Sequence, residues 1–214
     1  MRLFAICGVI ILQILIFPPE QLLERTQITM FPTVNTGPVL EASDVTCNFD
    51  KTRRDNFEDF CSWRNLANDE FDWMVGRFVG PINGALFQKV TGKRDQPNGN
   101  FLFASYAPQR ANSDRAVLAA DFNCQIGMAT LSFDFWSSAE LAAPALKVCR
   151  ESQGYRECFP EVNRSRPNPV SFSIPSMNRP FQLRIEASGL SMPNVMAIDN
   201  LRYQLARGAR ICTQ

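Results

Sequence analysis

The feature that most constrains the fold is a two-residue alternation of apolar and polar side chains in the second half of the chain. From Ala129 to Phe135 every second residue is apolar and the residues between are polar. Segments 170–174 and 181–186 repeat the pattern. A period of two is what a β-strand with one buried face requires. Because turn-forming residues separate such segments, the chain is predicted to be an all-β, antiparallel sandwich.

Two further regions give local predictions. From Gly76 to Gly99 turn-forming residues dominate, which predicts loops with a brief strand from Ala85 to Val90. Segments 141–149 and 154–159 flank a turn-like stretch at 150–153, which predicts a β-hairpin. Its facing strand positions lie about 4.5–5.5 Å apart, so Cys149 and Cys158 would be close enough for a disulfide.

The N-terminus has the pattern of a targeting signal. Arg2 precedes an apolar run from Leu3 to Phe17, and two prolines follow it. The run is short for a membrane span, so residues 1–17 are predicted to be a cleaved secretory signal peptide. The alternatives are an uncleaved signal anchor, which would hold a type II protein at the cell surface, and a buried strand or helix. Residues 18–44 are predicted to be an extension or linker, either a tether or a first short strand, and residues 45–214 the folded domain.

Cysteine usage agrees with an extracellular protein. Apart from Cys7 in the apolar run, the chain has six cysteines, an even number without the spacing of a zinc or redox motif. In an oxidising compartment they should form three disulfides. The alternative, six reduced cysteines in a cytosolic protein, conflicts with the N-terminal signal. Asn163 opens an Asn-Arg-Ser triplet and is a predicted glycosylation site.

Composition excludes several classes of function. The chain has 22 basic and 21 acidic residues and no histidine. The sequence has no basic stripe or run of the kind that would predict binding to nucleic acid or to an anionic membrane surface. Without histidine the commonest general base is absent, which favours a non-catalytic protein. The enzyme alternative rests on Asp69, Glu70 and Asp72, since two carboxylates can drive glycoside hydrolysis. Beside Phe71 and Trp73, however, such acids more often line a solvated strand face.

A series of motifs resembles the MAM domain, the extracellular module named after meprin, the A5 antigen and receptor phosphatase mu. The motifs follow the family's order from the first folded cysteine to the last. They are Cys47-Asn-Phe-Asp50, Cys61-Ser-Trp63, Asp69-Glu-Phe-Asp-Trp73, Ala116-Val-Leu118, Cys124 through Phe135-Trp136, Leu146-Lys-Val148, Phe181-Gln-Leu-Arg-Ile-Glu186 and Ala197-Ile-Asp-Asn200.

The resemblance implies a jelly-roll-like sandwich of two antiparallel sheets. It also implies first-to-second and third-to-last cysteine pairing, which leaves one pair for the predicted hairpin. The pairs are Cys47–Cys61, Cys124–Cys212 and Cys149–Cys158. MAM domains are non-catalytic modules for adhesion and receptor assembly, so the implied partners are extracellular proteins or a second copy of this chain. Membrane attachment is expected only if the signal segment is uncleaved.

Some MAM domains bind a cation, and this chain keeps part of that motif. The corresponding acids would be Asp50 and Asp199, whose oxygen atoms suit Ca²⁺ or Na⁺. The family's Asp-His-Thr is missing, and Asn200 replaces a second aspartate. We therefore favour the alternative that both acids make hydrogen bonds that close loops, with no cofactor. Trp63, Trp73 and Trp136 are likewise expected in the core.

A second functional class is carbohydrate or matrix binding, because jelly rolls are common in lectins. It would require an exposed aromatic side chain and a polar cluster at one rim of the sandwich. The loops at 50–56 and 76–99 are the candidates to supply them.

Overall fold

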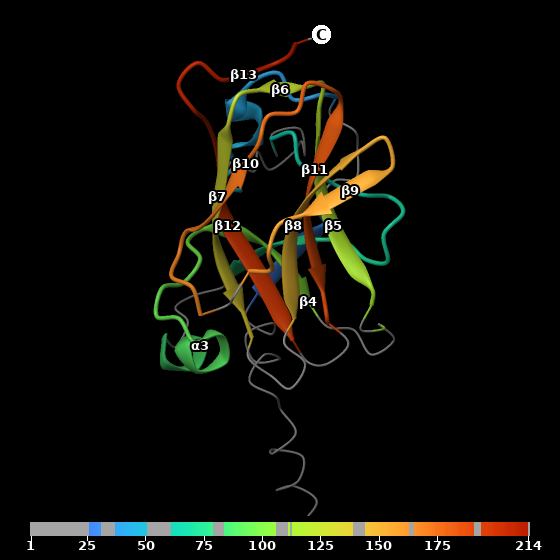
Figure 1. The fold of residues 1–214 in the computed structure, drawn as a ribbon. Helices are drawn as coiled ribbons and strands as arrows, with labels where there is room; N and C mark the ends of the chain where they lie inside the picture. Colours follow the sequence, from blue (N-terminus) through green and yellow to red (C-terminus); the bar gives the residue numbers. More distant parts are fainter. Residues whose placement is uncertain are drawn as a thin grey trace, which may run out of the picture.

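The computed structural model describes residues 26–30, 37–50, 61–78, 84–105, 111, 113–138, 144–162, 165–190 and 194–213. They form two antiparallel sheets that face each other as two layers (Figure 1). The predicted all-β, disulfide-stapled sandwich is therefore confirmed. The predicted signal peptide, residues 1–17, lies outside the described part. In that part no helix combines the length and apolar character needed to cross a membrane.

The first sheet has six strands in an order that mixes early and late segments of the chain. From edge to edge they are β1 (Thr26–Met30), β3 (Met74–Phe78), β4 (Asn100–Ser105), β12 (Val195–Leu205), β7 (Ala129–Ser137) and β10 (Val170–Ile174).

The second sheet has five strands, and a short two-stranded ribbon lies at one end of the sandwich (Figure 1). The five are β2 (Arg64–Asn65), β5 (Arg115–Phe122), β11 (Phe181–Ser188), β8 (Ala145–Ser152) and β9 (Tyr155–Cys158). The ribbon pairs β6 (Gln125–Ile126) with β13 (Arg210–Ile211).

The core fills the space between the two sheets and follows the predicted alternation. In β7 the apolar side chains of Ala129, Leu131, Phe133 and Phe135 are buried, while the polar ones between them are partly exposed. Trp63 and Trp73 are buried in this core as expected, whereas Trp136 is buried in a separate cluster with Phe87 and Val90. The same alternation leaves a second, outward set of positions on every strand.

The segment predicted as a brief strand at Ala85–Val90 is instead the α-helix α3 (Gly84–Thr91). Phe87 and Val90, three residues apart, lie on one helix face and are buried against Trp136 on the outer side of β7. That helical spacing buries both side chains together, whereas a strand would turn them to opposite faces. The strand prediction was therefore wrong, because the packing partner comes from a distant segment.

The predicted hairpin forms with a tighter turn than expected. β8 continues to Ser152, and only Gln153 and Gly154 make the turn, both with positive φ. Two residues with positive φ match the right-handed twist of the flanking strands. Cys149 and Cys158 lie directly opposite each other and are joined.

The two other disulfides are Cys47–Cys61 and Cys124–Cys212, so the three bonds are those that the sequence resemblance implies. Part of the predicted extension also belongs to the sandwich. β1 pairs with β3, Val39 is fully buried beside Phe122, and η1 (Ala42–Val45) follows it. Of the two alternatives for residues 18–44, the structure contains the short strand.

Candidate functional site

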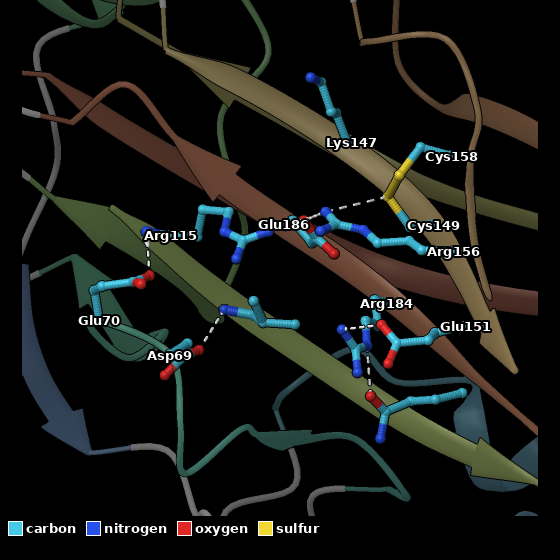
Figure 2. A network of polar contacts seen from close by, with 12 residues as sticks. Asp69, Glu70, Arg115, Lys147, Cys149, Glu151, Arg156, Cys158, Arg184 and Glu186 are labelled. Carbon is cyan, nitrogen blue, oxygen red and sulfur yellow. Dashed lines mark hydrogen bonds and ion pairs between the residues drawn. A yellow bond between two sulfur atoms is a disulfide. The ribbon is translucent and has the colours of Figure 1, made fainter. Parts of the chain in front are cut away.

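The outer side of the five-stranded sheet carries a continuous set of charged and amide side chains, called here the polar face. It arises from strict alternation along β11, where Leu183 and Ile185 point into the core while Gln182, Arg184 and Glu186 point outward. Neighbouring strands add outward polar residues, several of which are seen in Figure 2. The polar face consists of Arg64, Arg115, Asp121, Lys147, Glu151, Arg156, Gln182, Arg184 and Glu186.

One half of the polar face is a chain of hydrogen bonds that crosses four strands. Arg64 donates to Asp121 over 2.5 Å, and Gln182 donates to the other oxygen of Asp121 over 2.8 Å. Arg184 donates through Nε to Gln182 at 2.5 Å and forms an ion pair with Glu151 at 2.6 Å. In this series of hydrogen bonds each arginine therefore lies beside a carboxylate, and each side chain is held by a neighbour.

Beside this series of hydrogen bonds the surface is hollowed, at the point where β5 and β8 end and β11 begins. The hollow has a volume of about 330 Å³ and includes the buried Phe122 and Phe181, whose rings stack 4.8 Å apart. We call it the rim hollow. Its polar lining consists of Asp121, Asn123, Glu151, Ser152, Gln153, Gln182 and Arg184.

The other half of the polar face centres on Glu186, whose side chain is 3% exposed (Figure 2). Its Oε2 accepts a hydrogen bond from Arg156 and lies 3.7 Å from Nη1 of Arg115. Within the described residues, Oε1 has no hydrogen-bond partner. Arg156 also lies 3.8 Å from the sulfur of Cys149, so the guanidinium connects Glu186 to the hairpin disulfide.

The acidic cluster of the enzyme alternative is engaged with the edge of β5. Asp69 accepts a 2.6 Å hydrogen bond from the backbone N–H of Val117, and Glu70 accepts one of 3.0 Å from that of Arg115 (Figure 2). Burial raises the pKa of Asp69 to about 6, while the bond from Val117 opposes the rise. Burial also raises the pKa of Asp72. The first two acids thus extend the pairing of β5 beyond the end of the two-residue strand β2.

Asp50 and Asp199, the predicted cation ligands, come close enough to interact. Burial raises the pKa of Asp199 to about 7, and the charges of Asp50 and Asp134 add to the rise. Each acid makes a hydrogen bond that fixes a loop or bulge: Asp50 accepts from the N–H of Asn100 at 2.7 Å, and Asp199 from that of Asn200 at 2.6 Å.

Among the described residues, no three histidine, cysteine, aspartate or glutamate side chains group so that they could hold one ion. The hydrogen bonds of Asp50 and Asp199 are those of the favoured alternative, and a cation at these two acids stays an untested possibility of the family resemblance. Asn163, the predicted glycan acceptor, lies outside the described residues.

Sequence reasoning did not single out the polar face as a site. The sequence does contain one sign of it, because Gln182, Arg184 and Glu186 alternate with apolar residues. The partners Arg64, Asp121 and Glu151 come from segments up to about 120 positions away along the sequence, and only the order of the strands brings them together.

Comparison with known proteins places the chain in no family: no family model and no curated protein matches it. Twenty-four chains of known structure are similar. One is the carbohydrate-binding module TmCBM61 in complex with β-1,4-galactotriose, with 11% identity, a TM-score of 0.41 and coverage of 67% of this chain and 88% of that one.

Two others are larger proteins. The α-L-arabinofuranosidase MgGH51 has 14% identity and a TM-score of 0.43, with 82% of this chain and 28% of the enzyme covered. The enzymatically active domain of tailspike protein 4 from bacteriophage CBA120 has 14% identity and a TM-score of 0.44, with coverage of 79% and 22%. TM-scores below 0.5 at such identities assign the chain to none of these groups.

Proposed function

We propose that the chain is a secreted, non-catalytic interaction module that binds other extracellular proteins, or a second copy of itself, through the polar face. The observation that carries the proposal is the mixed-charge network on the outer side of the five-stranded sheet. Its side chains are fixed by one another and by a rigid sheet, so little side-chain entropy is lost when a partner binds. Fixed charges of both signs favour a partner with the complementary pattern and reject others.

The sequence supports an extracellular setting for this module. An N-terminal signal-like run precedes six cysteines, and these cysteines pair as the MAM resemblance implies. Disulfides of this kind form and persist in oxidising compartments. The module would then meet membrane-anchored or matrix proteins outside the cell.

The test uses the full chain secreted from eukaryotic cells and coupled to beads at high density. Bead aggregation reports self-binding, and a panel of extracellular domains reports binding to other proteins. The diagnostic variant exchanges the charges of an exposed ion pair, Lys147→Glu with Glu161→Lys, in which Lys147 belongs to the polar face and the two side chains lie 2.9 Å apart. The exchange keeps the internal ion pair but moves each charge, so stability should hold while partner binding falls.

A matched control is Lys89→Glu on α3, an exposed position against the opposite sheet. We expect this control to bind like the parent chain. Binding should also weaken as salt rises from about 0.15 M to about 1 M, because the screening length falls from about 8 Å to about 3 Å. Binding that survives the charge exchange and the salt would show that the interface lies elsewhere.

A further inference from the structure

We propose that the rim hollow is a binding site for a neutral carbohydrate, the end of an oligosaccharide chain. This inference concerns a different part of the molecule from the exposed pair used to test protein binding, and it does not depend on that function. It also differs from the loops at 50–56 and 76–99 that the sequence suggested for such a role.

The first observation is the shape and position of the hollow. It lies where three strands of one sheet end, so the backbone beneath its side chains is held by the sheet ladder. A volume of about 330 Å³ is at the lower limit for small-molecule sites. The hollow is therefore suited to one or two sugar rings rather than to a folded protein surface.

The second observation is the hydrogen-bonding capacity that remains in the lining. Nε and Nη1 of Arg184 contact Gln182 and Glu151, which leaves Nη2 available to donate to a ligand. Oε2 of Glu151 contacts Arg184, which leaves Oε1 available to accept from one. Gln182 donates one of its two amide hydrogens to Asp121. Among the described residues, the side-chain amide of Asn123 forms no hydrogen bond. Donors and acceptors thus face the same space and are already held in place by their neighbours.

The third observation is the balance of charge, which selects the class of ligand. An anion in the hollow would meet Asp121 and Glu151, and a cation would meet Arg184 and, behind Asp121, Arg64. Neither ion is favoured, because each charge is already paired. A ligand with many hydroxyl groups supplies both donors and acceptors without a net charge, which describes a neutral sugar.

The experiment titrates the secreted full chain with neutral di- to tetrasaccharides of glucose, galactose, mannose and xylose, followed by calorimetry and by NMR. The principal variant is Asn123→Ala, since this side chain makes no other hydrogen bond in the described structure and its loss should not disturb the fold. Lys147→Gln, on the same sheet face but outside the hollow, is the control.

We expect at least one neutral oligosaccharide to bind, and Asn123→Ala to weaken its binding about three- to tenfold, the effect of one lost hydrogen bond. Lys147→Gln should leave it unchanged. Failure of every neutral sugar to bind at millimolar concentration overturns the proposal. Binding confined to sulfated or sialylated glycans, or binding that Asn123→Ala leaves unchanged, overturns it too. None of these outcomes alters the bead test of protein binding.

Discussion

The carboxylate of Asp69 lies 2.6 Å from the backbone nitrogen of Val117, on the edge of β5 that β2 is too short to cover. A side chain in the loop after β2 thus takes the place of a strand carbonyl. An unpaired N–H at this buried position would cost about 1–3 kcal/mol.

The first prediction concerns this bond. Asp69→Ala should lower the free energy of unfolding by about 1–3 kcal/mol, whereas Asp69→Asn keeps an acceptor and should be nearly neutral. Because burial raises the pKa of Asp69 from 3.8 to about 6, the folded state binds the proton more tightly. Its contribution to stability therefore falls as pH rises from about 4 to about 6. Urea unfolding across this range should show the decline in the parent chain and a smaller one in Asp69→Asn. An equal decline in both would contradict the assignment.

The second prediction concerns Arg156 and Glu186. Arg156→Ala leaves the nearly buried carboxylate with Arg115 at 3.7 Å. The loss should be on the order of 2–3 kcal/mol, somewhat below that of a fully buried pair because Arg156 is 31% exposed. Adding Glu186→Gln to Arg156→Ala should recover part of the lost stability. A double-mutant cycle measures the coupling energy of the two residues. The exposed pair of Lys147 and Glu161 is the comparison and should give less than about 1 kcal/mol. Equal coupling energies in the two pairs would refute the distinction.

The third prediction concerns Asp199. Burial, with the charges of Asp50 and Asp134, raises its pKa from 3.8 to about 7. Since the folded state favours the protonated acid, its contribution to stability is greatest below about pH 4 and declines up to about pH 7. Asp199→Asn should therefore be more stable than the parent chain at about pH 8, and the difference should shrink toward about pH 4. Thermal unfolding at several pH values tests this, and a difference that grows toward low pH would exclude it.

The fourth prediction addresses the cation. If the hydrogen bonds of Asp50 and Asp199 are the whole role of these acids, Ca²⁺ or Na⁺ should leave the melting temperature unchanged relative to a chelated sample in an inert salt of equal ionic strength. A rise in melting temperature that Asp50→Asn abolishes would instead establish a cation site.

The fifth prediction compares disulfides by replacing both cysteines of a pair with alanine. In the chain-entropy account, Cys149–Cys158, with a sequence separation of 9, contributes about 2–3 kcal/mol. Cys124–Cys212, with a separation of 88, contributes about 4–5 kcal/mol. Denaturant unfolding should rank the two variants in this order. The reverse order would mean that loop length does not govern their contributions.

Local pattern was enough to predict the strands whose two faces differ. In β7 the alternation from Ala129 to Phe135 identifies the strand and its buried side, because each residue's environment is set by a neighbouring sheet on one side only. The hairpin of Cys149 and Cys158 was predictable for a related reason, because its contacts join residues that are close in sequence.

What the pattern could not supply are contacts between distant segments. Helix α3 depends on Trp136, about 50 positions away from its centre. The rim hollow requires β5, β11 and β8 to be neighbours, although along the chain two strands separate β8 from β11 and five strands separate β5 from β11. Outward residues on each strand can be listed from the sequence, but the strand order decides which of them meet.

The central claim, an extracellular disulfide-stapled interaction module, is tested most directly by intact mass and non-reducing peptide mapping of the chain expressed in eukaryotic cells. We predict protein in the medium that lacks residues 1–17 and carries Cys47–Cys61, Cys124–Cys212 and Cys149–Cys158. Protein that stays inside the cell with free thiols, or that forms other cysteine pairs, would contradict the account.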